Sequence, residues 1–148
     1  MSCWTRVPQR IRELAEIEAQ KTLKHVRANG RDPGTTLGDL WTGFVVEAMD
    51  AFLAGGEDEV LAWARHRRTL RGKSSDDGTD RDGYNIKAIP ENGGYVVVND
   101  DRAEKYRVYE FCPVQGVRLL GEFLQRDIRT IILPDGTVKQ GVYREQVR

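Results

Sequence analysis

Apolar residues recur at steps of three and four along the first segment of the chain, which is the spacing of one face of an α-helix. This pattern predicts a long amphipathic helix from about Val7 to Ala28. Pro8 suits its first turn, and Asn29-Gly30 suits its end because glycine adopts the left-handed cap conformation readily. The predicted apolar face consists of Val7, Ile11, Ala15, Ala19, Leu23 and Val26.

Two further helices are predicted before residue 74. The second begins at Thr36, because its hydroxyl and the carboxylate of Asp39 approximate a capping box. Its stripe over residues 37–53 is apolar around most of the circumference, which indicates burial on several sides. The third follows Gly55-Gly56, with acidic residues 57–59 in its first turn, where negative charge offsets the helix dipole.

The pattern changes to twofold alternation beyond the acidic segment 74–83, which contains no apolar residue and is predicted to be a flexible linker. Short runs of β-branched and aromatic residues separated by turn residues are typical of strands. Short connections favour antiparallel neighbours, since a parallel crossover needs a dozen residues or more. The predicted strands are Tyr84 to Ile89, Tyr95 to Val98, Lys105 to Phe111, Val117 to Leu124, Ile128 to Leu133 and Val138 to Arg144.

Together these patterns predict an α+β fold in which about three N-terminal helices precede a five- or six-stranded antiparallel β-meander. The predicted organisation is a helical subdomain over residues 1–73, the linker over residues 74–83 and a sheet subdomain over residues 84–148. Apolar residues lie on both faces of the strands near the C-terminus, so one face of the sheet should be covered, and the helices are the available cover.

Composition narrows the class of protein further. The chain has 148 residues with 23 basic and 23 acidic side chains, so its overall field does not draw it to polyanions, although a local patch remains open. The sequence has neither a membrane-spanning apolar run nor the apolar region of a signal peptide, which predicts a cytoplasmic protein with no membrane partner. Cys3 and Cys112 are too few for a disulfide framework.

A basic cluster in the third helix is the most prominent candidate binding feature. Clustered guanidinium groups neutralise phosphates and release counterions, so nucleic acid or an acidic partner is a candidate ligand. The alternative is that arginine gathers at a helix C-terminus for reasons of dipole and solubility. The cluster consists of Arg65, Arg67, Arg68, Arg71 and Lys73, with His66 among them.

A second candidate surface lies on the strand around residues 105–111, where aromatic and charged residues alternate. Arg107 and Tyr109 could extend a nucleic-acid surface, because aromatic rings stack on bases and arginine binds the backbone. Tyrosine and phenylalanine are also strong strand formers, so the same alternation follows from a two-faced sheet.

No catalytic residue, metal ligand or cofactor is predicted. His25 and His66 lack partners at metal-ligand spacing, and the aspartates before Gly83 do not align with a calcium loop. The Pro134-Asp135-Gly136-Thr137 run is explained as a hairpin turn rather than as part of a nuclease site.

The wide helix faces and the aromatic residues present more apolar surface than a domain of this size buries internally. This surplus predicts association with another protein, and a homodimer is the commonest assembly. We therefore expect a non-enzymatic binding module, a small regulator or inhibitor that acts through protein–protein contacts. Small proteins of this kind are often encoded by phages and mobile elements. The alternatives are a nucleic-acid-binding protein and a small-ligand binder with a pocket between the helices and the sheet.

Overall fold

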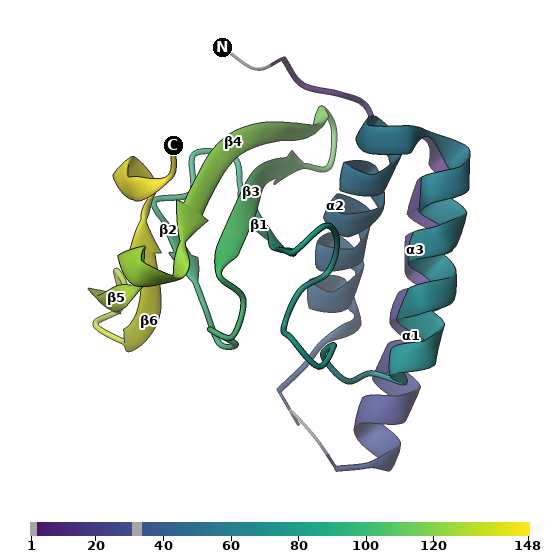
Figure 1. Cartoon of the computed structure of the whole chain (residues 1–148), viewed down its shortest axis with the longest axis horizontal. Helices are drawn as coiled ribbons and strands as arrows, with labels where there is room; N and C mark the ends of the chain where they lie inside the picture. Colours follow the sequence, from purple (N-terminus) through teal and green to yellow (C-terminus); the bar gives the residue numbers. More distant parts are fainter. Residues whose placement is uncertain (1–2, 31–33) are drawn as a thin grey trace. The chain divides into compact units, whose positions relative to one another are not determined.

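The computed structural model of this chain describes residues 3–30 and 34–148 (Figure 1). These residues form two compact units. The helical unit comprises the described part of residues 6–75, and the β unit comprises residues 3–5 and 76–148. Three helices precede the strands, which confirms the predicted α+β class.

The helical unit contains α1 (Gln9–Ala28), α2 (Leu37–Gly55) and α3 (Glu57–Leu70). The N-cap of α2 is Thr36, whose side-chain oxygen accepts a hydrogen bond from the backbone nitrogen of Asp39 at 3.2 Å, as the capping pattern predicts. The predicted apolar face of α1 is buried, and α2 is buried continuously from Phe44 to Ala51. Phe44 and Trp63 make an edge-to-face contact between α2 and α3.

Charged side chains are also buried in the helical unit. Glu18 and Glu47 are 1% and 9% exposed, and each accepts hydrogen bonds from an arginine of α3. Burying a carboxylate is costly unless it is paired, so these pairs fix α3 against α1 and α2.

The β unit contains six strands in two three-stranded sheets, one with the order β1-β3-β4 and the other with the order β2-β6-β5. Two short 3₁₀-helices, η1 (Gln125–Asp127) and η2 (Arg144–Gln146), follow β4 and β6. The strands are β1 (Tyr84–Pro90), β2 (Tyr95–Val97), β3 (Lys105–Cys112), β4 (Gly116–Leu124), β5 (Arg129–Ile132) and β6 (Val138–Tyr143).

The predicted antiparallel meander is wrong, because β1 pairs with β3 in parallel and the chain changes sheets after β1, after β2 and after β4. The turn after Pro90 places β2 in the second sheet instead of returning it along β1, so β2 becomes part of a crossover long enough for parallel pairing. Only β3–β4 and β5–β6 are antiparallel neighbours in both sequence and space.

Buried residues from the two sheets form one core in the β unit. Tyr106 and Phe123 stack with their ring centroids 4.7 Å apart and their planes 2° from parallel. Gly141 brings β6 close to β2, since a Cβ there would lie 2.0 Å from the Val96 carbonyl oxygen. The core residues are Ile89, Val96, Val98, Ala103, Tyr106, Val108, Phe123, Val142 and Val147.

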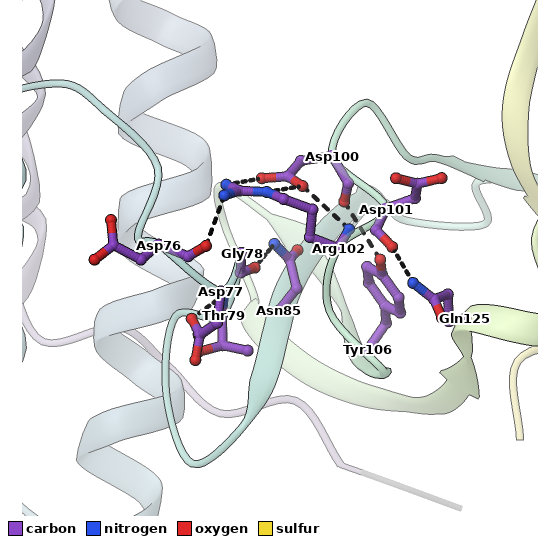
Figure 2. A network of polar contacts seen from close by, with 10 residues as sticks. All are labelled: Asp76, Asp77, Gly78, Thr79, Asn85, Asp100, Asp101, Arg102, Tyr106 and Gln125. Carbon is purple, nitrogen blue, oxygen red and sulfur yellow. Dashed lines mark hydrogen bonds and ion pairs between the residues drawn. The ribbon is translucent and has the colours of Figure 1, made fainter.

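A polar network joins the segment before β1 to the loop before β3, as Figure 2 shows. Arg102 donates from Nε and Nη2 to both carboxylate oxygens of Asp100, at 2.9 and 2.7 Å, and from Nη1 to the Asp76 carbonyl oxygen at 2.8 Å. The hydrogen bond from Arg102 lowers the pKa of the Asp100 carboxyl, against the opposing effect of burial. Asn85 donates to the Gly78 carbonyl oxygen at 2.8 Å, so residues 76–80 are hydrogen-bonded within the β unit.

Across the described ranges, every helix is too short or too polar to cross a lipid bilayer.

Candidate nucleic-acid interface

Helices α1 and α3 run in the same direction, so their C-terminal ends lie side by side (Figure 1). Arg10, in the first turn of α1, forms an ion pair with Glu57, the first residue of α3. Further along both helices, Arg68 Nε lies 2.8 Å from Glu18 Oε2. The chain leaving α3 passes the last turns of α1, where a Cβ on Gly72 would lie 3.2 Å from the Thr22 carbonyl oxygen.

This arrangement brings together two stretches of sequence that contain no aspartate or glutamate, residues 19–30 and residues 60–75. Apart from Arg67, their cationic side chains and both histidines of the chain make up what we call the basic end. Cations at two helix C-termini also interact favourably with the helix dipoles. The basic end consists of Lys21, Lys24, His25, Arg27, Arg65, His66, Arg68, Arg71 and Lys73.

Several cations of the basic end are available to a ligand. The side chains of Lys24, Arg27, Arg65 and Lys73 are exposed, and none of them makes a hydrogen bond or ion pair with another residue in ranges 3–30 and 34–148. Arg71 is exposed and ends α3 in the left-handed conformation, with φ of 48°. An anion that binds the two lysines and two arginines named first would therefore not have to displace a carboxylate from them.

The side chains of the predicted cluster on α3 do not all face solvent. Arg67 is not on the surface of the basic end, because its side chain is 11% exposed and Nη2 lies 2.6 Å from Glu47 Oε1. The same carboxylate oxygen accepts a hydrogen bond from Trp63 Nε1 at 3.0 Å, and the Arg67 guanidinium stacks 4.7 Å from the centre of the Phe44 ring. Arg67 thus holds α3 on α2 instead of facing solvent.

Arg68 has an intermediate position. Its side chain is 47% exposed, while its Nε is held by the buried carboxylate of Glu18. Lys21 approaches the same carboxylate, with 4.0 Å between Nζ and Oε2. One buried acid therefore orients two cations of the basic end, one from each helix.

The structure does not bring Arg107 and Tyr109 together with the α3 residues into one unit, because both belong to β3. The Arg107 guanidinium lies 4.1 Å from the centre of the Tyr84 ring, and its Nε lies 3.6 Å from Glu122 Oε2. Tyr109 is only 4% exposed, so its ring lacks the open face on which a base would stack.

Sequence reasoning missed the half of the basic end that α1 contributes, from Lys21 to Arg27. The signal was the absence of acidic residues after Glu18 in that helix. That absence gains meaning only when the parallel packing of α1 and α3 is known.

The histidine, cysteine and carboxylate side chains of the described residues do not gather into a metal site. Within residues 3–30 and 34–148, no three side chains from histidine, cysteine, aspartate and glutamate lie close enough together to hold a metal ion. Cys3 is an exposed free thiol and Cys112 a half-buried one.

No protein-family model, curated protein or solved structure matches this chain significantly.

Proposed function

We propose that this protein is a nucleic-acid-binding module that contacts the phosphate backbone with the basic end of its helical unit. The observation that carries the proposal is the parallel pairing of two helix ends that lack acidic residues, with cations from both helices on one surface. Such a surface neutralises phosphates and releases their counterions, which favours binding without base specificity.

The salt dependence of such binding can be worked from the structure. Lys24, Arg27, Arg65 and Lys73 are exposed cations of the basic end whose side chains make no hydrogen bond or ion pair with a described residue. Each phosphate neutralised on duplex DNA contributes about 0.9 to the slope of log affinity against log salt, so four contacts give a slope of about −3.6. Affinity should then fall roughly a hundredfold between about 50 and about 200 mM salt.

The test is fluorescence anisotropy with labelled duplex and single-stranded DNA over a series of salt concentrations. The double variant Lys24→Gln with Arg27→Gln should reduce the slope by about 1.8. A matched control removes two exposed cations outside the basic end, Arg6→Gln with Lys139→Gln, and should leave the slope unchanged. Absence of binding at low salt, or an equal loss of slope in the control, would overturn the proposal.

A second candidate function, regulation of a protein partner, rests on the β5–β6 hairpin. Ile132 and Val138 face each other directly in the ladder and are 62% and 60% exposed. An exposed cross-strand apolar pair is typical of a contact surface, and a second copy of the chain is the simplest partner for it.

Sedimentation over a range of protein concentrations tests this contact. A dimer should form in the wild type and dissociate in the double variant Ile132→Thr with Val138→Thr, whereas Val114→Thr, which changes an exposed residue of the β3–β4 turn, serves as control. A wild-type mass that stays that of one chain would contradict self-association.

A further inference from the structure

The β unit contains an open cleft of about 530 Å³ between the end of β4, η1, the start of β5 and the C-terminal residues. This volume lies within the range of small-molecule sites, roughly 300–1,000 Å³. Both apolar and charged residues line it, and one of them, Phe123, belongs to the core of the unit.

One oxygen of each carboxylate in the cleft, and the amide oxygen of Gln146, already accept hydrogen bonds from the protein. Glu122 Oε1 accepts a hydrogen bond from the Tyr84 hydroxyl at 2.9 Å, and Asp127 Oδ2 accepts one from the Leu124 backbone nitrogen at 2.9 Å. The Gln146 side-chain oxygen accepts a third, from the Tyr143 backbone nitrogen at 2.9 Å.

The donor groups of the cleft are not engaged in the same way. Arg126, Arg129 and Arg148 are exposed, and their guanidinium groups make no hydrogen bond or ion pair with the residues that the structure describes. The amide nitrogen of Gln146 is a further donor on the lining, since its oxygen is the atom that the protein uses. Three guanidinium groups thus line the cleft beside the two carboxylates of Glu122 and Asp127, and the guanidinium groups are the charged groups there that make no hydrogen bond or ion pair with a described residue.

We propose that this cleft binds a small organic oxyanion, a molecule that carries a phosphate or carboxylate group. Two guanidinium groups can each hold such a group through paired hydrogen bonds, which is the geometry that arginine provides and lysine does not. The engaged carboxylates of Glu122 and Asp127 are held by other donors, so the arginines are not neutralised by direct ion pairs within the cleft. The site is separate from the basic end, because all its residues belong to the β unit.

Isothermal titration of the full chain with inorganic pyrophosphate and with citrate, at constant ionic strength, tests the proposal and distinguishes the two oxyanion classes. Binding of either anion is expected, and Arg126→Gln and Arg129→Gln should each weaken it about tenfold or more, since a charge-assisted pair is lost. Lys139→Gln, an exposed cation of β6 that does not line the cleft, is the control.

Absence of heat with both anions at millimolar concentrations, or equal weakening in the Lys139→Gln control, would overturn the proposal. Circular dichroism of the arginine variants should match the wild type, because neither guanidinium has a partner within the described residues. The basic-end variant Lys24→Gln with Arg27→Gln should keep full anion binding. The small-anion proposal can therefore stand or fail independently of the nucleic-acid proposal. DNA competing with pyrophosphate for the cleft would instead assign the arginines to nucleic acid and refute a separate small-anion site.

Discussion

Replacement of Glu110 should lower the free energy of unfolding of the β unit in a pH-dependent way. Its side chain is 1% exposed, and Oε1 accepts hydrogen bonds from Arg118 Nε at 2.8 Å and Arg144 Nη2 at 3.1 Å. Oε2 accepts a third bond from the Asn92 backbone nitrogen at 2.7 Å. Arg118 also lies 4.5 Å from the centre of the Trp4 ring, so one carboxylate joins the N-terminal residues, β3, β4, η2 and the β1–β2 turn.

The pKa of Glu110 gives the size of the effect. Burial raises this pKa, but the hydrogen bonds from Arg118, Arg144 and Asn92 outweigh burial and lower the pKa from 4.5 to about 2. A folded-state pKa below the unfolded value means that the ionised form stabilises the fold at pH values above 4.5. At about 1.4 kcal/mol for each pKa unit, the contribution is about 3 kcal/mol, and it is lost as the pH falls from 4.5 towards 2.

Urea unfolding followed by circular dichroism measures this contribution. Glu110→Gln should lower the free energy of unfolding by about 3 kcal/mol at neutral pH, because it leaves two arginines without their carboxylate. The difference from the wild type should shrink as the pH is lowered through 4.5. Glu104→Gln, an exposed residue of the same unit, should change little. A Glu110→Gln protein as stable as the wild type at neutral pH, or a difference that does not change with pH, would refute the reasoning.

Two further predictions concern the cores of the two units. Glu47→Gln should lower the free energy of unfolding by about 3 kcal/mol in urea titrations, because Arg67 would keep a buried charge without its carboxylate; a loss below about 0.5 kcal/mol would contradict this. Ile131→Ala should lower the free energy of unfolding, measured by thermal denaturation, by about 3 kcal/mol, because Ile131 is fully buried. Ile132→Ala, on the exposed face of β5, should lower it by less than about 0.5 kcal/mol. Equal effects at these two neighbours would show that the faces of β5 are assigned wrongly.

The sequence predicts the elements well because local chemistry determines them. Thr36 caps α2 through Asp39, and the predicted strand runs agree with the observed strands to within about two residues. Strand pairing could not be predicted in the same way, because alternation of side chains indicates which residues face the core and not which strand lies alongside. Gly141 illustrates this: it pairs with Val97 of β2 and with Arg129 of β5, and its sequence context reveals neither partner.

The candidate sites were only partly predictable for a similar reason. The α3 half of the basic end is a run of cations that can be seen in the sequence, but Arg67 within that run turns inward to a glutamate of α2 twenty residues earlier in the chain. The cleft of the β unit combines Arg126 and Arg129, which are three residues apart in the chain, with Arg148 from its C-terminal end. The position of Arg148 depends on its backbone pairing with Glu122 on β4, which no local pattern reveals.

The net charge of zero does not describe how charged side chains are distributed between the interior and the surface. Carboxylates such as Glu18, Glu47 and Glu110 are buried and engaged by arginines, so their negative charge is neutralised inside the fold and does not reach solvent. Cations such as Arg27 and Arg129 are exposed and have no partner among the described residues. Residues 19–30 and 60–75 contain cations and no aspartate or glutamate, so a ligand at the basic end meets more positive charge than the overall balance of 23 basic and 23 acidic residues indicates. A net charge of zero argues against anionic ligands only where exposed cations and exposed carboxylates are evenly mixed, and at the basic end they are not.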